Sequence, residues 1–144
     1  MLCDKRVPLG LKSKVYRMVV RPAVLYRSEC WPLKKTQVQR LTVAEMRMLR
    51  WMCSCTRSDR IRNGVIRDLV KVAPIGDKMR ESRLRWFGHV KRRNVDAPVR
   101  RCERINISEG RRGRGRPKKS LDEVIREDLK VAGLTEGMAQ DRKL

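Results

Sequence analysis

Apolar residues recur at intervals of three and four over long stretches of the chain, and this spacing restricts the fold more than any other feature. An α-helix completes a turn in about 3.6 residues, so side chains at these intervals lie on one face. The clearest run predicts a helix that begins at Thr36, a suitable N-cap residue, and ends at Met52. Its stripe consists of Val38, Leu41, Glu45, Met48, Leu49 and Met52.

The same spacing predicts three further helices. The first covers Leu11–Tyr26, and Pro22 should kink or end it near Arg21 because proline lacks a backbone N–H. Another is expected between residues 59 and 74, and a third over Asp77–Val90. Their stripes consist of Leu11, Val15, Met18, Val19 and Leu25; of Ile61, Val65, Ile66, Leu69 and Val70; and of Met79, Arg83, Trp86 and Val90, beside Leu84 and Phe87. No alternating pattern predicts a β-strand, so we expect a mainly α fold in which residues 1–93 form a small helical bundle.

The composition changes after Arg93. Residues 100–119 hold nine basic and two acidic side chains together with three glycines. Such a segment buries too little surface to offset the entropy of ordering, so we predict that residues 94–119 form an extended, flexible basic linker. Residues 120–144 form a short helical segment in which Ser120 and Glu123 make a capping box, Gly133 ends the helix and Thr135 caps a further one.

The net charge of +21, from 37 Lys and Arg against 16 Asp and Glu, indicates a polyanionic partner, and RNA or DNA is the first candidate. Residues 77–93 contribute seven basic and two acidic side chains. Basic groups neutralise phosphates, and an aromatic ring can stack on an unpaired base or pack in the core instead. The binding residues predicted here are Arg83, Arg85, Trp86, Lys91, Arg92 and Arg93.

The run from Arg111 to Lys119 is the sharpest local motif. Its Arg114-Gly115-Arg116-Pro117 core is similar to an AT-hook, in which Arg-Gly-Arg lies in a narrow minor groove. The same run suits a nuclear import signal, so a nuclear location is expected, or a cytoplasmic one without import; a solvated linker that binds polyanions without preference is the alternative. The predicted binding residues are Arg111, Arg112, Arg114, Arg116, Lys118 and Lys119.

The sequence offers little for catalysis. We find no paired-carboxylate motif of the two-metal polymerase kind and no phosphate-binding glycine loop, and His89 is the only imidazole. Five cysteines make an odd count, which disfavours a disulfide framework, and they lack the spacing of a zinc site. No stretch is long and apolar enough to cross a bilayer. We therefore expect no catalytic residue, no metal, no cofactor and no membrane partner.

Several short blocks occur in a fixed order from about Leu11 onward. They are Lys14-Val15-Tyr16, Val20-Arg21-Pro22-Ala23-Val24-Leu25-Tyr26, Ser28-Glu29-Cys30-Trp31, Leu49-Arg50-Trp51-Met52, Asp59-Arg60-Ile61-Arg62-Asn63, Arg83-Leu84-Arg85-Trp86-Phe87-Gly88-His89-Val90 and Arg114-Gly115-Arg116-Pro117-Lys118-Lys119. This series resembles the region just beyond the polymerase palm in reverse transcriptases of long interspersed elements (LINE), the non-long-terminal-repeat retrotransposons. Arg27 and Leu121 depart from the family, since many relatives have Gly and Trp there.

The resemblance implies a fragment of an RNA-directed DNA polymerase. The family's catalytic aspartates lie upstream of the matched region, so the resemblance implies thumb-like helices and a basic connector that hold template RNA and primer DNA, without polymerase activity. It also implies the missing palm of a related element as a partner. Two alternatives stay open, a small AT-hook-like DNA-binding protein and a non-functional remnant without specific binding.

Overall fold

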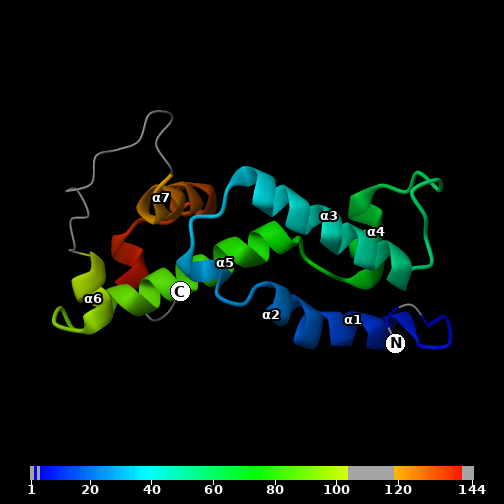
Figure 1. Ribbon diagram of the computed structural model, residues 1–144, viewed down its shortest axis with the longest axis horizontal. Helices are drawn as coiled ribbons and strands as arrows, with labels where there is room; N and C mark the ends of the chain where they lie inside the picture. Colours follow the sequence, from blue (N-terminus) through cyan, green and yellow to red (C-terminus); the bar gives the residue numbers. More distant parts are fainter. Residues whose placement is uncertain (1, 3, 104–118, 141–144) are drawn as a thin grey trace. The chain divides into compact units, whose positions relative to one another are not determined.

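The chain is helical in the computed structural model, which describes residues 2, 4–103 and 119–140 (Figure 1). No strand occurs within these ranges, so the prediction of a mainly α fold is confirmed. The chain forms two compact units, which we call the first unit (residues 1–28 and 33–79) and the second unit (residues 29–32 and 80–144). The predicted bundle of residues 1–93 therefore includes parts of both units.

The first helical stretch of the chain passes through Pro22 without ending there. Helix α1 (Leu9–Val15) continues into a π-helical turn, η1 (Tyr16–Val20), and then into α2 (Arg21–Val24). In an α-helix the ring of Pro22 would collide with the carbonyl four residues earlier. The wider π turn directly before it avoids this collision, so the stretch is deformed rather than terminated.

The apolar face predicted for this stretch is wrong. Leu11, Met18 and Val19 are 46%, 67% and 62% exposed, whereas Lys12 and Ser13 are buried. The reason lies in the ends of two neighbouring helices, whose last carbonyls have no partner within their own helix. Lys12 Nζ donates to the carbonyl of Met52 at 3.2 Å, and Ser13 Oγ donates to the carbonyl of Val70 at 2.5 Å. Capping these carbonyls turns the polar face of α1 inward.

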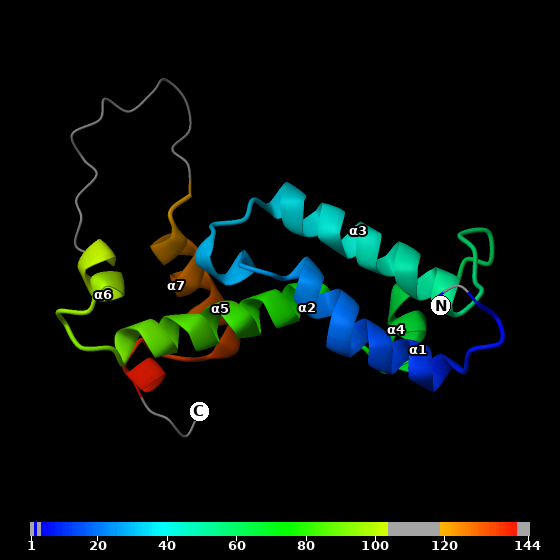
Figure 2. The same cartoon turned by 60° about the horizontal axis from the view of Figure 1, so that its bottom comes forward.

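The carbonyls capped by α1 belong to α3 (Lys35–Met52) and α4 (Asn63–Val70). Both views place these helices beside α1 in the first unit (Figures 1 and 2). The core of the first unit consists of Tyr16, Met46, Leu49, Met52, Ile66, Val70 and Val72. The three-four spacing therefore identified the inner face of α3 and, on α4, Ile66 and Val70. Val65 and Leu69, predicted for the same stripe, are 49% and 55% exposed, so the buried face of α4 is narrower than predicted.

The starts of these two helices differ from the prediction. Thr36 lies in the first turn of α3, and the backbone N–H of Lys34 donates to Gln37 Oε1 at 2.8 Å instead. Helix α4 begins at Asn63, because Asp59 is tied into the preceding loop: its Oδ2 accepts from the backbone N–H of Thr56 at 2.6 Å. This hydrogen bond, with a second from the Thr56 hydroxyl, lowers the pKa of the Asp59 carboxyl.

Helix α5 spans Ile75–Lys91 and begins two residues before its predicted start; its residues 80–91 belong to the second unit. In this unit α5 packs against α7 (Leu121–Ala132), through a core of Phe87, Ile125 and Leu129. The capping box of α7 is confirmed, since the N–H of Glu123 donates to Ser120 Oγ at 3.2 Å and the N–H of Ser120 donates to the Glu123 carboxylate at 3.2 Å.

The ends of the chain's last helices combine confirmed and corrected predictions. Gly133 ends α7 in the left-handed conformation, with φ of 68°, as predicted. A short 3₁₀ turn (Gly137–Gln140) follows, and the backbone carbonyl of Thr135 accepts a hydrogen bond from the N–H of Met138.

The predicted linker is not extended throughout. Residues Pro98–Glu103 form α6, and Pro98 lies at the start of this helix, where no N–H is needed. Residues 104–118 of that linker lie outside the described residues.

Candidate nucleic-acid interface

Arg83 lies inside the second unit rather than on its surface. It is 5% exposed, and its Nε lies 2.8 Å from Asp128 Oδ2 on α7. Arg80 also faces this carboxylate, with its Nε 3.6 Å from Oδ1. The predicted role of Arg83 in binding nucleic acid has no support in this position, because the guanidinium is held between helices. Its place on the apolar stripe of α5 was the signal for burial.

The aromatic side chains of α5 also belong to the core. Phe87 is 6% exposed, and the half-buried Trp86 packs against the same cluster. Lys91 Nζ lies over the Phe87 ring, 5.2 Å from its centre, in a cation–π arrangement. Of the two roles open to Trp86, packing therefore has the structural support, and base stacking by this side chain does not.

The remaining predicted residues of α5 face solvent. The side chain of Arg85 is 75% exposed and pairs with Glu81 at 2.7 Å, a contact between neighbouring turns that adds only about 0.3–0.5 kcal/mol. Arg92 and Arg93 follow at the end of α5 and are exposed. Arg93 Nη2 lies 3.1 Å from His89 Nε2, and arginine only donates, so Nε2 is the acceptor. His89 thus supports the position of Arg93.

Helix α6 adds a basic position that was not among the predicted binding residues. Arg101 is exposed on this short helix. Together, residues 80–103 carry eight basic and three acidic side chains. The signal for α6 was Pro98, which suits the first turn of a helix, but the charge and glycine content further along the linker obscured it.

Most of the AT-hook-like motif lies outside the residues that the structure describes. Arg111, Arg112, Arg114, Arg116 and Lys118 lie outside the described residues, so their predicted role stays a prediction. Lys119 is described, is exposed and forms an ion pair with Glu127 of α7.

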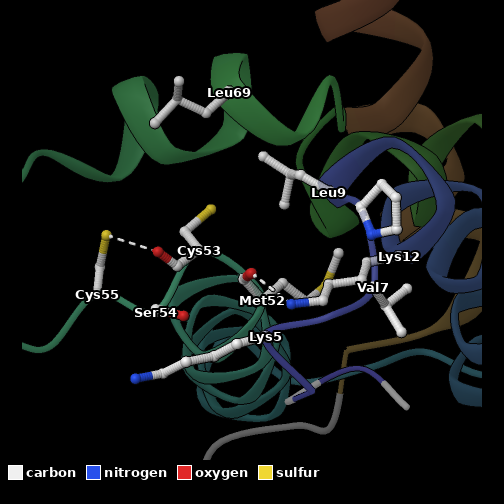
Figure 3. Close-up of a pocket in the computed structure, with 10 residues that line it drawn as sticks. Lys5, Val7, Leu9, Lys12, Met52, Cys53, Ser54, Cys55 and Leu69 are labelled. Carbon is white, nitrogen blue, oxygen red and sulfur yellow. Dashed lines mark hydrogen bonds between the residues drawn. The ribbon is translucent and has the colours of Figure 1, made fainter.

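A cavity of about 570 Å³ opens in the first unit where α1 meets the end of α3 (Figure 3). Its walls are Lys5, Val7, Pro8, Leu9, Lys12, Met52, Cys53, Ser54, Cys55 and Leu69. Burial raises the pKa of the Cys53 thiol, the neighbouring Cys55 adds to this effect, and Lys12 opposes it. No group of three potential metal ligands occurs among the residues that the structure describes.

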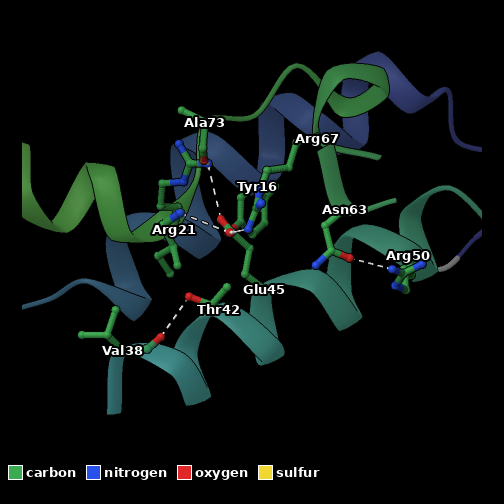
Figure 4. A network of polar contacts seen from close by, with 10 residues as sticks. Tyr16, Arg21, Val38, Thr42, Glu45, Arg50, Asn63, Arg67 and Ala73 are labelled. Carbon is green, nitrogen blue, oxygen red and sulfur yellow. Dashed lines mark hydrogen bonds and ion pairs between the residues drawn. The ribbon is translucent and has the colours of Figure 1, made fainter. Parts of the chain in front are cut away.

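A buried carboxylate organises the first unit, and the sequence analysis assigned it no role. Glu45 of α3 is fully buried (Figure 4). Its Oε1 accepts from the Tyr16 hydroxyl at 2.9 Å, while its Oε2 accepts from Arg67 Nη2 at 3.3 Å and from the backbone N–H of Ile75 at 3.1 Å. Arg21 Nη2 lies 3.6 Å from Oε1 and donates to the carbonyl of Ala73 at 2.7 Å. One carboxylate thus joins α3 to η1, α2, α4 and the start of α5, and an acid within the apolar stripe of α3 was its only sign.

The π turn brings two of these partners to the same side of their helix. Residues five apart in an α-helix point about 140° away from each other, at about 100° per residue. In η1 the N–H of Arg21 bonds to the carbonyl of Tyr16, five residues earlier, so both side chains face Glu45. The Arg21 guanidinium lies 5.2 Å from the centre of the Tyr16 ring. Burial, followed by the charge of Glu45, raises the pKa of Tyr16 to about 12.

Comparison with known proteins adds no relative to this description. No protein-family model matches the chain, and neither the curated proteins nor the solved structures include one with significant similarity. No helix within the described ranges is both long enough and apolar enough to span a membrane.

Proposed function

We propose that the chain is a nucleic-acid-binding fragment of a LINE-type reverse transcriptase that lacks the catalytic palm and has no polymerase activity of its own. The observation that carries the binding part is the excess of basic side chains on α5 and α6, with Arg85, Arg93 and Arg101 exposed. Lys and Arg at a surface displace the counterions that surround nucleic-acid phosphates, and this release drives association at low salt. The family part rests on the ordered sequence blocks.

The exposed apolar side chains of the first helical stretch favour a fragment over a complete small protein. Leu11, Met18 and Val19 lie on one side of α1 and η1, where water contacts them. A palm that covers this side would explain why three large apolar residues occur there. The palm of a related element is therefore the protein partner in this proposal, alongside template RNA and primer DNA.

Binding is tested by fluorescence anisotropy with a labelled single-stranded RNA and a labelled DNA duplex over a series of salt concentrations. We expect the logarithm of the association constant to fall linearly with the logarithm of the salt concentration. The double variant Arg93→Gln/Arg101→Gln should flatten this slope on duplex DNA by about 0.9 for each phosphate that the protein no longer neutralises. No salt-dependent binding at low salt would refute the proposal and leave a non-functional remnant.

A matched control distinguishes binding at a defined interface from attraction by the net charge alone. The variant Arg40→Gln/Arg47→Gln removes two exposed arginines of α3 and lowers the net charge by the same amount. We expect it to leave the slope nearly unchanged. Equal flattening in both double variants would mean that the charge attracts nucleic acid without a defined interface on α5 and α6.

The AT-hook-like motif supports a second candidate, a small DNA-binding protein that acts through the minor groove. This candidate predicts that Arg114→Ala and Arg116→Ala weaken binding to an A·T-rich duplex more than to a G·C-rich one, because narrow A·T minor grooves attract inserted arginine. Equal weakening on both duplexes would leave a basic linker without preference.

A further inference from the structure

The cavity at the end of α3 contains a cation that its surroundings only partly balance. Lys12 is 3% exposed, and its ammonium group carries three donors, of which one reaches the carbonyl of Met52. No carboxylate in the described part of the chain forms an ion pair with it. The end of α3 supplies a partial negative charge of about half an elementary charge, which leaves part of the ammonium charge uncompensated. A buried charge without a full partner is costly.

The two thiols of the cavity do not provide the missing anion. Cys53 and Cys55 both line the space, and Cys55 Sγ lies 3.5 Å from the carbonyl of Cys53 (Figure 3). The raised pKa of Cys53 keeps this thiol protonated at neutral pH. Among the wall residues that the structure describes, there is a second lysine, Lys5, but no acidic side chain.

Apart from Ser54, the other described residues of the wall are apolar. Val7, Pro8 and Leu9 form one part of it, and Met52 and Leu69 another. A volume of about 570 Å³ is within the range of small-molecule sites, which are commonly lined by apolar groups with a few polar ones that fix orientation. Apolar walls beside an incompletely paired ammonium select a ligand that has an anionic end and a hydrocarbon body.

We propose that this cavity binds a small organic carboxylate, with the carboxylate at Lys12 and a short hydrocarbon chain against Leu9, Met52 and Leu69. The site is independent of the basic surface on α5 and α6 and of the proposed binding of nucleic acid. It assigns to Lys12 a second role beside capping α3.

The thiols in the wall allow a direct test on the full chain. Sodium hexanoate serves as the probe, and alkylation of each cysteine by neutral iodoacetamide is followed by mass spectrometry. A ligand in the cavity shields Cys53 and Cys55, and mass action predicts about five-fold slower alkylation at four times the dissociation constant. Cys30 and Cys102, both exposed and in the second unit, provide the internal reference and should react at an unchanged rate.

Three comparisons make the result specific. 1-Hexanol has the same chain without the charge, and inorganic phosphate has charge without a chain, so both should protect the two thiols much less than hexanoate. Lys12→Met keeps the length of the side chain but removes its charge, and should abolish protection. Lys14→Met changes an exposed lysine on the same helix and should retain it.

Several outcomes would overturn the proposal. If hexanol protects Cys53 and Cys55 as well as hexanoate does, Lys12 does not bind the carboxylate. This comparison uses the unaltered protein, so it can be made even when Lys12→Met fails to fold. Phosphate or a DNA duplex that protects equally well would refute an organic ligand. Equal slowing at Cys30 and Cys102, or no slowing at Cys53 and Cys55, would refute a site in the cavity.

Discussion

Replacement of Glu45 by alanine is the most informative perturbation of the first unit. It removes a fully buried carboxylate and leaves the Tyr16 hydroxyl and the Arg67 guanidinium, whose side chain is 17% exposed, without their acceptor. Removing one partner of a buried ion pair costs about 3–5 kcal/mol. The first unit has about 75 residues, and at about 0.05–0.15 kcal/mol per residue its total stability is about 4–11 kcal/mol. The variant should therefore lose about a quarter or more of that stability.

Amide hydrogen exchange measured by mass spectrometry resolves this effect by region. At about 1.36 kcal/mol for each factor of ten, we expect exchange in the slowest peptides of α3 and α4 to accelerate at least a hundred-fold. Asp68→Ala is the control, since it removes an exposed acid from α4 and should change stability by less than about 0.5 kcal/mol. Acceleration below ten-fold in Glu45→Ala, or equal effects of the two variants, would refute the organising role of Glu45.

Three further predictions concern single contacts. The pKa of Tyr16 is about 12 in the folded chain against an ordinary value of 10.0. The contribution of this shift to stability, about 3 kcal/mol, is therefore complete below pH 10 and is lost as the pH rises to about 12. In urea unfolding the difference between the natural chain and Tyr16→Phe should shrink over this range, and parallel pH curves would contradict this. Arg83→Met should lower the free energy of unfolding in urea by about 2–3 kcal/mol, which is less than the loss of a fully buried pair because Arg80 stays near Asp128. Adding Asp128→Leu should restore part of the lost stability, and a further loss of stability in the double variant would contradict the ion-pair account. Gly133→Ala should cost about 1–2 kcal/mol in thermal unfolding of the second unit because φ is 68° there and no neighbour lies within 4 Å, and an unchanged midpoint would contradict the left-handed cap.

Local signals predicted the fold well where the partners of a residue lie within a few positions of it. The capping box of Ser120 and Glu123, the end of α7 at Gly133 and the inner face of α3 are all of this kind. Each depends on helix geometry and backbone conformation, which neighbouring residues determine. The helical fold class followed from the same repeated spacing.

The candidate sites were less predictable because their partners are distant in sequence. Lys12 reaches a carbonyl 40 residues away, and Arg83 reaches an acid on α7. Spacing identifies which residues share a face, but it does not say whether a charged residue on that face has a partner across the core. For this reason the sequence predicts the wrong buried face for α1. It also predicts that Arg83 binds nucleic acid, although the position of Arg83 on the apolar stripe of α5 indicates burial.

The π turn makes the length of one short segment as important as its composition. Tyr16 and Arg21 meet at Glu45 because five peptide units separate them along a widened turn. Met18 and Val19, which lie between them, face solvent, so replacing either side chain would leave the contacts at Glu45 in place. Loss of one of these two residues would restore α-helical winding. Tyr16 and Arg21 would still share a side, about 40° apart, but the ring of Pro22 would meet the carbonyl four residues before it. This segment accordingly tolerates changes in the kind of residue but not in their number.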